Sequence, residues 1–440
     1  MPESPYIDRP LYLQMLDAWK ENKLIKVIMG PRRCGKSVLL EMFMDRLRER
    51  GVGDDQIIYL ELNKKEYEGF LTDDSLHAEI LRRWDQKSFA YLFIDEVQEC
   101  RNFEEALASL QGRKNLDIYV TGSNSKMLSG ELATLLTGRY LPINMLPFSF
   151  KEFRTAVASE GKSSRDDFRQ YLSVGSFPEV IPYRNDRKFQ SLYYRVLLED
   201  MIGKDMKGRY SINDETTLRR LIRTLASSVG SAFSIRKISN TLSSEGAKSN
   251  NVTIGKYLEA LENSYLFYRA RRFDVRGRAN LKSKEKFYLC DAAFRNHLVN
   301  TTYPDFGHLL ENVVYLELLR RYPSVNIGKN GSHEVDFAVQ DENGDFLYFQ
   351  VAQSVMDPGT LEREISAFDG IPDNYPRILL TLDEFGANSS INGIHHLNAI
   401  DWLLSLDLPQ GPRGDGPKAL RCAASGGLQP PRSPLPTRTP

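Results

Sequence analysis

The sequence lacks the features that place a chain in a membrane or build it around metal-binding cysteines. Only four of its 440 residues are cysteine, and no two of them stand at C-x-x-C spacing, which argues against zinc motifs and a disulfide framework. No apolar run reaches the length of a membrane span, and no apolar leader follows the first residue. We therefore expect a cytoplasmic protein with reduced thiols and no membrane partner.

The chain also has no excess of charge of either sign. Lysine and arginine together number 58, as do aspartate and glutamate, so no global field draws the protein to nucleic acid. Any affinity for DNA or RNA must come from a local cluster. Hydrophobic residues make up 41% of the chain and charged residues 26%, as in ordinary globular proteins, and the length suffices for two or three domains.

What the sequence does contain is a phosphate-binding loop in "IMGPRRCGKSVLL". Gly30, Gly35, Lys36 and Ser37 satisfy the pattern G-x-x-x-x-G-K-[ST]. Its glycines let backbone N–H groups surround phosphates, its lysine contacts the β and γ phosphates, and its serine hydroxyl can bind Mg²⁺. The apolar run "LIKVIM" before it predicts a strand and "SVLLEMFMDRLRER" after it a helix, which aims a helix N-terminus at an anion.

The remaining parts of an ATP site follow two later predicted strands. Asp95 and Glu96 end "AYLFIDE", where the first acid would bind Mg²⁺ with Ser37 and the second would orient the attacking water. Thr121, Ser123 and Asn124 end "LDIYVTGSNS", where they would reach the γ-phosphate or simply form a turn. The predicted nucleotide-binding residues are Gly30, Pro31, Arg32, Arg33, Cys34, Gly35, Lys36, Ser37, Val38 and Asn124.

Two further residues carry expectations about this site. Arg139 in "LLTGRY" would supply positive charge to the transition state, in its own subunit or in a neighbour's site, or would be a surface ion-pair residue. With Lys36 and Glu96 it completes the predicted catalytic set. Cys34 lies inside the loop, so we expect a bulky thiol reagent to block nucleotide binding.

Several motifs together resemble a known family. "GPRRCGKSVLL", "FIDEVQEC", "VTGSNSKMLSGELATLLTGRYLPINMLPFSFKEF", "GHLLENVVYLELLRRY" and "HEVDF" are similar to the bacterial and archaeal ATPases of the AAA type that carry a C-terminal domain of unknown function. The resemblance runs from about Tyr6 to about Ser405. It implies binding and hydrolysis of ATP with Mg²⁺, and it names no substrate.

The pattern of apolar residues predicts an α/β protein with five segments. Residues 1–155 are expected to form a three-layer domain with a parallel sheet, with strands near 24–29, 56–61, 90–94 and 117–121. A helical linker or lid would occupy 156–215. Residues 216–290 have the outline of a winged helix-turn-helix, with helices at 234–242 and 250–266 and a hairpin turning at Gly277. Residues 291–405 would form a small α+β domain, and the Pro/Gly/Arg-rich segment 406–440 is expected to be disordered.

The predicted wing contains a local cluster of basic residues. Between Arg269 and Lys286 lie eight lysines and arginines against Asp274 and Glu285. Such a hairpin could follow the phosphate backbone of DNA or RNA. Alternatively, charged residues merely protect a solvated strand edge.

The last folded segment has the layout of a degenerate nuclease. The predicted helix carries Glu311 and Glu317, and the strand "HEVDFAV" carries Glu334 and Asp336, as in the restriction-endonuclease-like fold. The E-x-K position on the next strand has become Gln350-Val351-Ala352, so both the second acid and the amine are missing unless Gln353 or Lys329 replaces them. We expect no nuclease activity.

The sequence therefore predicts a Mg²⁺-dependent ATPase that acts as a switch or motor, with nucleic acid as a candidate partner. Two other uses stay open: a protein-interaction switch of the defence or toxin–antitoxin type, and a nucleotide-binding scaffold without hydrolysis. The sequence does not decide whether the protein forms a homo-oligomer.

Overall fold

The first sheet is built from the strands that the apolar runs predict. The computed structural model describes residues 6–125, 135–157, 161–210, 212–244, 250–299 and 306–405. Its first sheet has the strand order β2-β3-β4-β1-β5, and every pairing in it is parallel. The strands are β1 (Ile25–Met29), β2 (Ile57–Glu61), β3 (Ala90–Asp95), β4 (Leu116–Gly122) and β5 (Tyr140–Asn144). Four of them confirm the prediction; β5 was not predicted.

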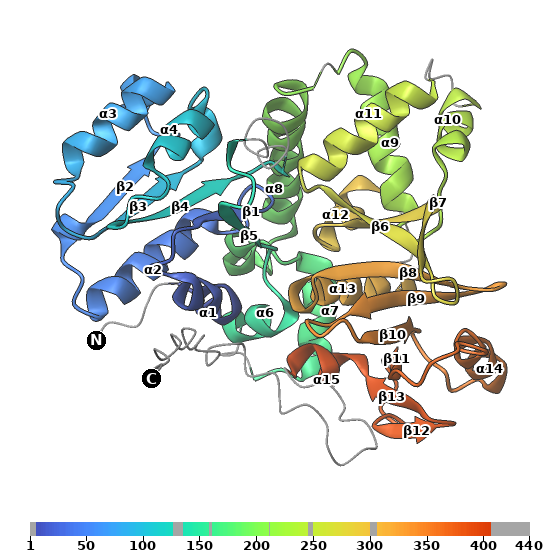
Figure 1. Cartoon of the computed structure of the whole chain (residues 1–440). Helices are drawn as coiled ribbons and strands as arrows, with labels where there is room; N and C mark the ends of the chain where they lie inside the picture. The colour runs from blue at the N-terminus through green and yellow to red at the C-terminus, as the bar shows by residue number, and fades with distance from the viewer. Residues whose placement is uncertain are drawn as a thin grey trace, which may run out of the picture.

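Helices cover both faces of this sheet, which confirms the three-layer arrangement (Figure 1). One face packs against α1 (Pro10–Trp19) and α2 (Lys36–Glu49), and the other against α3 (Asp73–Arg83) and α4 (Phe103–Leu110). Alternate residues of β3 divide between the layers. Phe93 stacks on Tyr119 beneath α2, whereas Leu92 joins the cluster under α3 and α4. Short 3₁₀ helices lie at Asp54–Gln56, Lys65–Phe70 and Val97–Glu99.

A helical region stands between the two sheets of the molecule (Figure 1). It contains α6 (Phe150–Val157), α7 (Ser164–Val174), the 3₁₀ helix η6 (Pro178–Tyr183), α8 (Arg187–Asp200), α9 (Glu215–Ser227), α10 (Ile235–Ser244), α11 (Asn251–Asn263) and α12 (Ala293–Leu298). Helix α8 continues directly into η7, a π-helix at Met201–Lys207. Helices α10 and α11 match the two predicted for the helix-turn-helix outline.

The second sheet has eight strands in the order β12-β13-β11-β10-β9-β8-β6-β7. They are β6 (Phe267–Asp274), β7 (Ala279–Leu289), β8 (Ser324–Asn330), β9 (His333–Gln340), β10 (Phe346–Val351), β11 (Arg377–Thr381), β12 (Ser389–Ile391) and β13 (Ile394–Asn398). Helices α13 (Phe306–Arg321), α14 (Pro358–Ser366) and α15 (Ala399–Leu404) accompany them. The β6–β7 hairpin, which we expected to be a separate wing, forms one end of this sheet because β6 pairs in parallel with β8. The predicted boundary at residue 290 therefore lies within one sheet.

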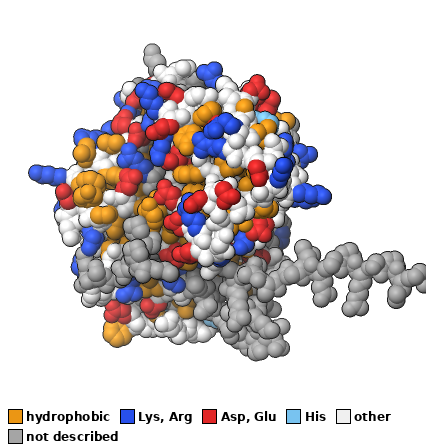
Figure 2. Space-filling model, turned by 90° about the vertical axis from the view of Figure 1, so that its left-hand side faces the viewer, with side chains coloured by type: hydrophobic (Ala, Val, Ile, Leu, Met, Phe, Trp, Pro, Cys, Tyr) orange, Lys and Arg blue, Asp and Glu red, His pale blue; other side chains and the backbone are white. Residues whose placement is uncertain are grey.

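One hydrophobic core joins these parts. It extends from Phe43 in α2 through Tyr194 in α8 to Leu310 in α13 and Trp402 in α15. On the face shown in Figure 2, acidic and basic side chains are interspersed, in keeping with the equal numbers of each in the chain. Within the described ranges, no helix is both long and apolar enough to span a membrane.

Candidate functional site: a nucleotide site at the end of the first sheet

The loop between β1 and α2 needs both of its glycines. A Cβ on Gly30 would lie 2.0 Å from the carbonyl oxygen of Met145, and Gly35 adopts a φ of +99° just before α2 begins. Only glycine fits both positions without strain. Lys36 is buried, and its Nζ donates to the carbonyls of Gly30 at 3.2 Å and Pro31 at 3.1 Å. The loop backbone thus holds the ammonium group in place. Val38 follows in the first turn of α2.

The two residues expected to hold Mg²⁺ lie together. Ser37 Oγ donates a hydrogen bond of 2.7 Å to Asp95 Oδ2, and Thr121 donates to Oδ1 of the same carboxylate. Burial raises the pKa of Asp95, while these two hydrogen bonds oppose the shift. A hydroxyl beside a carboxylate suits Mg²⁺, which binds through few protein oxygens and completes its shell with phosphate and water. Among the described residues, no group of three or more histidine, cysteine, aspartate or glutamate side chains is arranged to hold a metal ion by itself.

Glu96 occupies the position expected of the residue that orients water. Its backbone has a left-handed φ of 53°, and its N–H donates to Thr121 Oγ1 at 2.9 Å. Burial alone would raise the pKa of Glu96, but the charge of Lys36, whose Nζ lies 3.9 Å away, and a hydrogen bond from Gln98 leave it below its usual value. An ionised carboxylate accepts hydrogen bonds well and takes protons poorly. Its surroundings therefore favour orienting water over removing its proton.

A residue that sequence reasoning missed connects the loop to the helical region. Asp205 in η7 is fully buried and accepts two hydrogen bonds from Arg32, at 2.6 and 2.9 Å. Ser123 Oγ donates to its carboxylate and the Asn124 amide to its backbone carbonyl, each at 3.3 Å. We call this bidentate pair the Arg32–Asp205 latch. The Asn124 amide is thus directed at η7, and a contact between Asn124 and nucleotide stays a prediction.

The second arginine of the loop also contacts this region. Arg33 donates to Asp200, the last residue of α8, at 2.9 Å, and its guanidinium lies over the ring of Tyr193. Behind the loop, Arg9 is buried and donates to the carbonyl of Cys34 at 3.1 Å and to Glu152 at 2.8 Å. The loop is therefore held by two distant parts of the chain, Arg9 near the start and the region of α8 and η7.

Two expectations about this site need correction. Arg139 immediately precedes β5, which runs parallel to β1 with Tyr140 opposite Ile25, so it lies at the opposite end of β1 from the loop, about 20 Å along the strand. Arg139 is exposed there and cannot act in its own subunit's site; action in a neighbour's site stays a prediction. Cys34 is completely buried, and burial raises the pKa of its thiol. A bulky reagent cannot reach it in the folded protein, contrary to our expectation.

The basic cluster between Arg269 and Lys286 is largely neutralised within the molecule. Four of its eight cations pair with acids: Arg269 with Glu262 and Glu285, Arg272 with Glu334, Arg278 with Asp373, and Lys286 with Glu311. A fifth, Arg276, donates to the neutral amide of Asn330. Lys286 is buried and cannot reach nucleic acid. Arg271 and Lys284 remain exposed. The charge available to a phosphate backbone on this hairpin is therefore much smaller than the sequence suggests.

Lys286 instead completes the nuclease-like cluster. Its Nζ lies 3.0 Å from Glu311, 3.2 Å from Glu334 and 3.5 Å from Asp336. An ammonium group from β7 therefore lies among the acids of the predicted nuclease-like layout; replacement of the E-x-K amine by Gln353 or Lys329 stays a prediction.

The other members of the nuclease-like layout are tied to protein groups. Gln350 accepts from the backbone of Asp336 at 3.2 Å and donates to Glu364 at 2.7 Å. Glu317 forms ion pairs with Arg320 and Arg321 on its own helix, α13.

The fold and the nucleotide site together define an AAA-type P-loop ATPase domain. A family profile described as "AAA domain" matches residues 22–154, and one described as "Domain of unknown function (DUF8612)" matches residues 165–305. A Haemophilus influenzae protein described as uncharacterized is 36% identical over 401 residues, which are 90% of this chain and 98% of that protein. The chain belongs to the same family of AAA-domain proteins as this relative.

More distant similarities extend to archaea. An uncharacterized protein of Methanocaldococcus jannaschii is 28% identical over 358 residues, which are 78% of each chain. Among solved structures, a Walker-type ATPase of Pyrococcus abyssi is 16% identical, with a TM-score of 0.48, over 67% of this chain and 96% of that one.

Proposed function

We propose that this protein is a cytoplasmic, Mg²⁺-dependent ATPase that works as a nucleotide-controlled switch. The observation that carries the proposal is the grouping of Lys36, Ser37, Asp95 and Glu96 at one end of the parallel sheet. These four side chains provide a cation for phosphate, two oxygen ligands for a metal and an ionised carboxylate for water, which are the parts that phosphoryl transfer to water requires.

Each residue has a defined task in the reaction. The N–H groups at the start of α2 and the ammonium of Lys36 bind the phosphates of ATP. Ser37 and Asp95 would hold magnesium, which neutralises charge on the β and γ phosphates. Glu96 orients a water molecule whose oxygen attacks the γ-phosphorus as the bond to the bridging oxygen of ADP breaks. The products are ADP and inorganic phosphate.

The latch supports a switch rather than a passive scaffold. Arg32 and Arg33 belong to the phosphate-binding loop, yet their partners Asp205 and Asp200 belong to η7 and α8. Phosphates bound in the loop would compete for the same guanidinium groups. Binding and release of nucleotide would therefore break and re-form the ion pairs that connect the loop to α8 and η7. Helix α8 packs in the core shared with the rest of the molecule.

Two substitutions test the ATPase assignment. Lys36→Ala should abolish ATP binding, whereas Glu96→Gln should retain binding and lower turnover at least about a hundredfold, as expected when a group that positions the nucleophile is lost. Glu99→Gln, the same change at an exposed position three residues later, is the matched control and should keep wild-type turnover. Phosphate release and ATP titration are the measurements. Wild-type turnover in Glu96→Gln would remove that residue from the mechanism.

The same assay separates the uses of the switch. Stimulation of turnover by added DNA or RNA would favour a nucleic-acid partner. If neither DNA nor RNA changes the turnover rate, the protein-interaction switch is favoured. If ATP binds but is not hydrolysed, the nucleotide-binding scaffold is favoured.

A further inference from the structure

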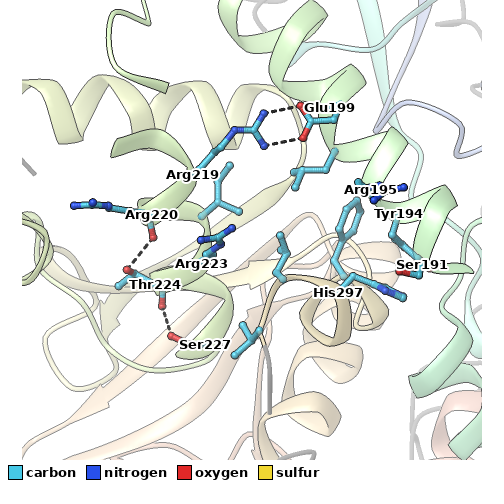
Figure 3. Close-up of a pocket in the computed structure, with 15 residues that line it drawn as sticks. Ser191, Tyr194, Arg195, Glu199, Arg219, Arg220, Arg223, Thr224, Ser227 and His297 are labelled. Carbon is cyan, nitrogen blue, oxygen red and sulfur yellow. Dashed lines mark hydrogen bonds and ion pairs between the residues drawn. The ribbon is translucent and has the colours of Figure 1, made fainter. Parts of the chain in front are cut away.

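A groove of about 940 Å³ lies between α8, α9 and α12, apart from the nucleotide site. Its charged lining comes mainly from arginine: Arg195 on α8 and Arg219, Arg220 and Arg223 on α9, with Glu199 as the acidic residue among the lining side chains. In Figure 3, Arg219 faces Glu199, Arg223 lies near the middle of the view, and the side chain of Arg220 points away from the other labelled residues. In a chain with no net charge, such a concentration of guanidinium groups marks a local site for anions.

The arginines of the groove differ in how they are neutralised. Arg219 makes a bidentate contact with Glu199, at 2.7 and 2.5 Å (Figure 3). It also pairs with Glu215. Arg195 and Arg223 are exposed, and within the described part of the chain no hydrogen bond or ion pair engages either guanidinium. Two charges therefore remain available to a ligand, one on each helix.

Aromatic rings form the floor of the same groove. His297 of α12 stacks on Tyr194 of α8 with ring centroids 4.7 Å apart and an interplanar angle of 17°, and Phe294 packs edge-on against Tyr194. His297 lies at the protein surface, and desolvation by the groups packed around it lowers its pKa, which favours the neutral imidazole. A flat neutral ring beside exposed guanidinium groups is the combination that binds a base together with its flanking phosphates.

We propose that this groove binds single-stranded nucleic acid, with phosphates on Arg195 and Arg223 and a base stacked against His297. A duplex keeps its bases stacked inside and cannot offer one to the ring. The proposal does not depend on ATP hydrolysis. It also moves the nucleic-acid contact from the largely neutralised β6–β7 hairpin to a surface that motif analysis did not single out.

The test is fluorescence anisotropy of a labelled 20-nucleotide single strand, without ATP or magnesium, over a series of salt concentrations. The double variant Arg195→Ala/Arg223→Ala should bind at least about tenfold more weakly at 50 mM salt, and its log–log salt slope should fall by about 1.4, or about 0.7 for each lost phosphate contact. The matched control is Arg271→Ala/Lys284→Ala, which removes two exposed cations from the hairpin and should leave both values unchanged.

Further variants separate the contributions of charge and stacking. His297→Ala should weaken binding and His297→Phe should restore it, because a phenyl ring also stacks. Glu199→Gln should strengthen binding, since it removes the groove's acidic residue, a result that a merely structural role would not produce. Circular dichroism and ATP titration confirm that each variant is folded.

Four results would overturn the proposal. They are no binding by wild-type protein at 50 mM salt, wild-type affinity in the groove variant, equal affinity for duplex, and displacement of the strand by equimolar inorganic phosphate or thymidine monophosphate. The last would indicate a pocket for small anions. ATP turnover is measured separately. It shows whether the ATPase assignment holds even if the groove does not bind single-stranded nucleic acid.

Discussion

Replacing Asp205 by asparagine should lower stability and raise ATP affinity at the same time. The exchange keeps the volume of the side chain but leaves the guanidinium of Arg32 without a counter-charge. Removing one partner of a buried ion pair costs about 3–5 kcal/mol when the other charge stays buried. The Arg32 side chain is 17% exposed and can turn toward water. We therefore expect the free energy of unfolding without nucleotide to fall by about 2 kcal/mol, less than that range.

The affinity for ATP should change in the opposite direction. Asp205 also contacts Ser123 at the end of β4, so its negative charge lies close to the bound phosphates. At a separation of about 8 Å and an effective dielectric constant of about 20, one unit charge contributes about 2 kcal/mol per phosphate charge. Removing it and freeing Arg32 should tighten ATP binding roughly ten- to thirtyfold at low ionic strength.

Calorimetric titration with ATP and thermal unfolding with and without ATP measure the two effects. Asp200→Asn is the matched control, because it removes one acid partner of Arg33, which keeps Glu179 at 3.7 Å, in a pair whose side chains are 32% and 30% exposed. Such a pair contributes about 0–1 kcal/mol, so both quantities should change little. Equal or weaker ATP affinity in a folded Asp205→Asn protein would refute competition between the latch and the phosphates.

Further predictions concern single residues. The pKa of Asp336 is raised to about 7, by burial and then by Glu311, with Lys286 opposing. The folded state therefore binds this proton more tightly than the unfolded chain, so the stabilisation is complete below about pH 4 and is lost as pH rises through 7. Asp336→Asn should flatten this decline in the unfolding midpoint between pH 5 and 8; an unchanged slope would contradict the assignment. In a variant with Cys34 as its only cysteine, an aromatic disulfide reagent should react at least about a hundredfold more slowly with native than with denatured protein. Arg139→Ala should keep wild-type turnover at dilutions where the protein is monomeric, and a loss of turnover there would restore a role in its own subunit. With Mg²⁺ or Mn²⁺ the protein should leave plasmid and single strands intact; cleavage that disappears in Asp336→Ala would show a working nuclease.

The strands of the first sheet were predictable where burial is complete on both faces. All residues of β1 and β3 are buried, and their sequences are apolar except for Lys26, which pairs with buried Asp117, and Asp95 at the end of β3. Strand β5 has only Ile143 buried among its five residues, and it leaves no such pattern. It forms because β1 provides an unpaired edge, which the local sequence does not reveal.

The nucleotide site was predictable only as far as its motifs are contiguous. The loop and the acidic pair are short local patterns, and their geometry agrees with the roles given to Ser37, Asp95 and Glu96. Asp205 lies 173 residues after its partner Arg32, and no periodicity links them. Lys286 was counted with a surface cluster because a run of charges in sequence does not reveal which members point inward. On β7, the side chain of Lys286 is buried on the same face as Tyr288, which follows it by two residues. The side chain of Lys284 is exposed to water.

The pairing of β6 with β8 also limits how this protein can be divided. A truncation or gene fusion at residue 290 would strip the hairpin of the strand that satisfies its inner edge and would leave the ammonium of Lys286 without its carboxylates. Recombination between relatives should therefore keep residues 267–405 as one inherited block. A fragment beginning at residue 291 should aggregate through the exposed edge of β8, although its sequence alone looks like an independent domain.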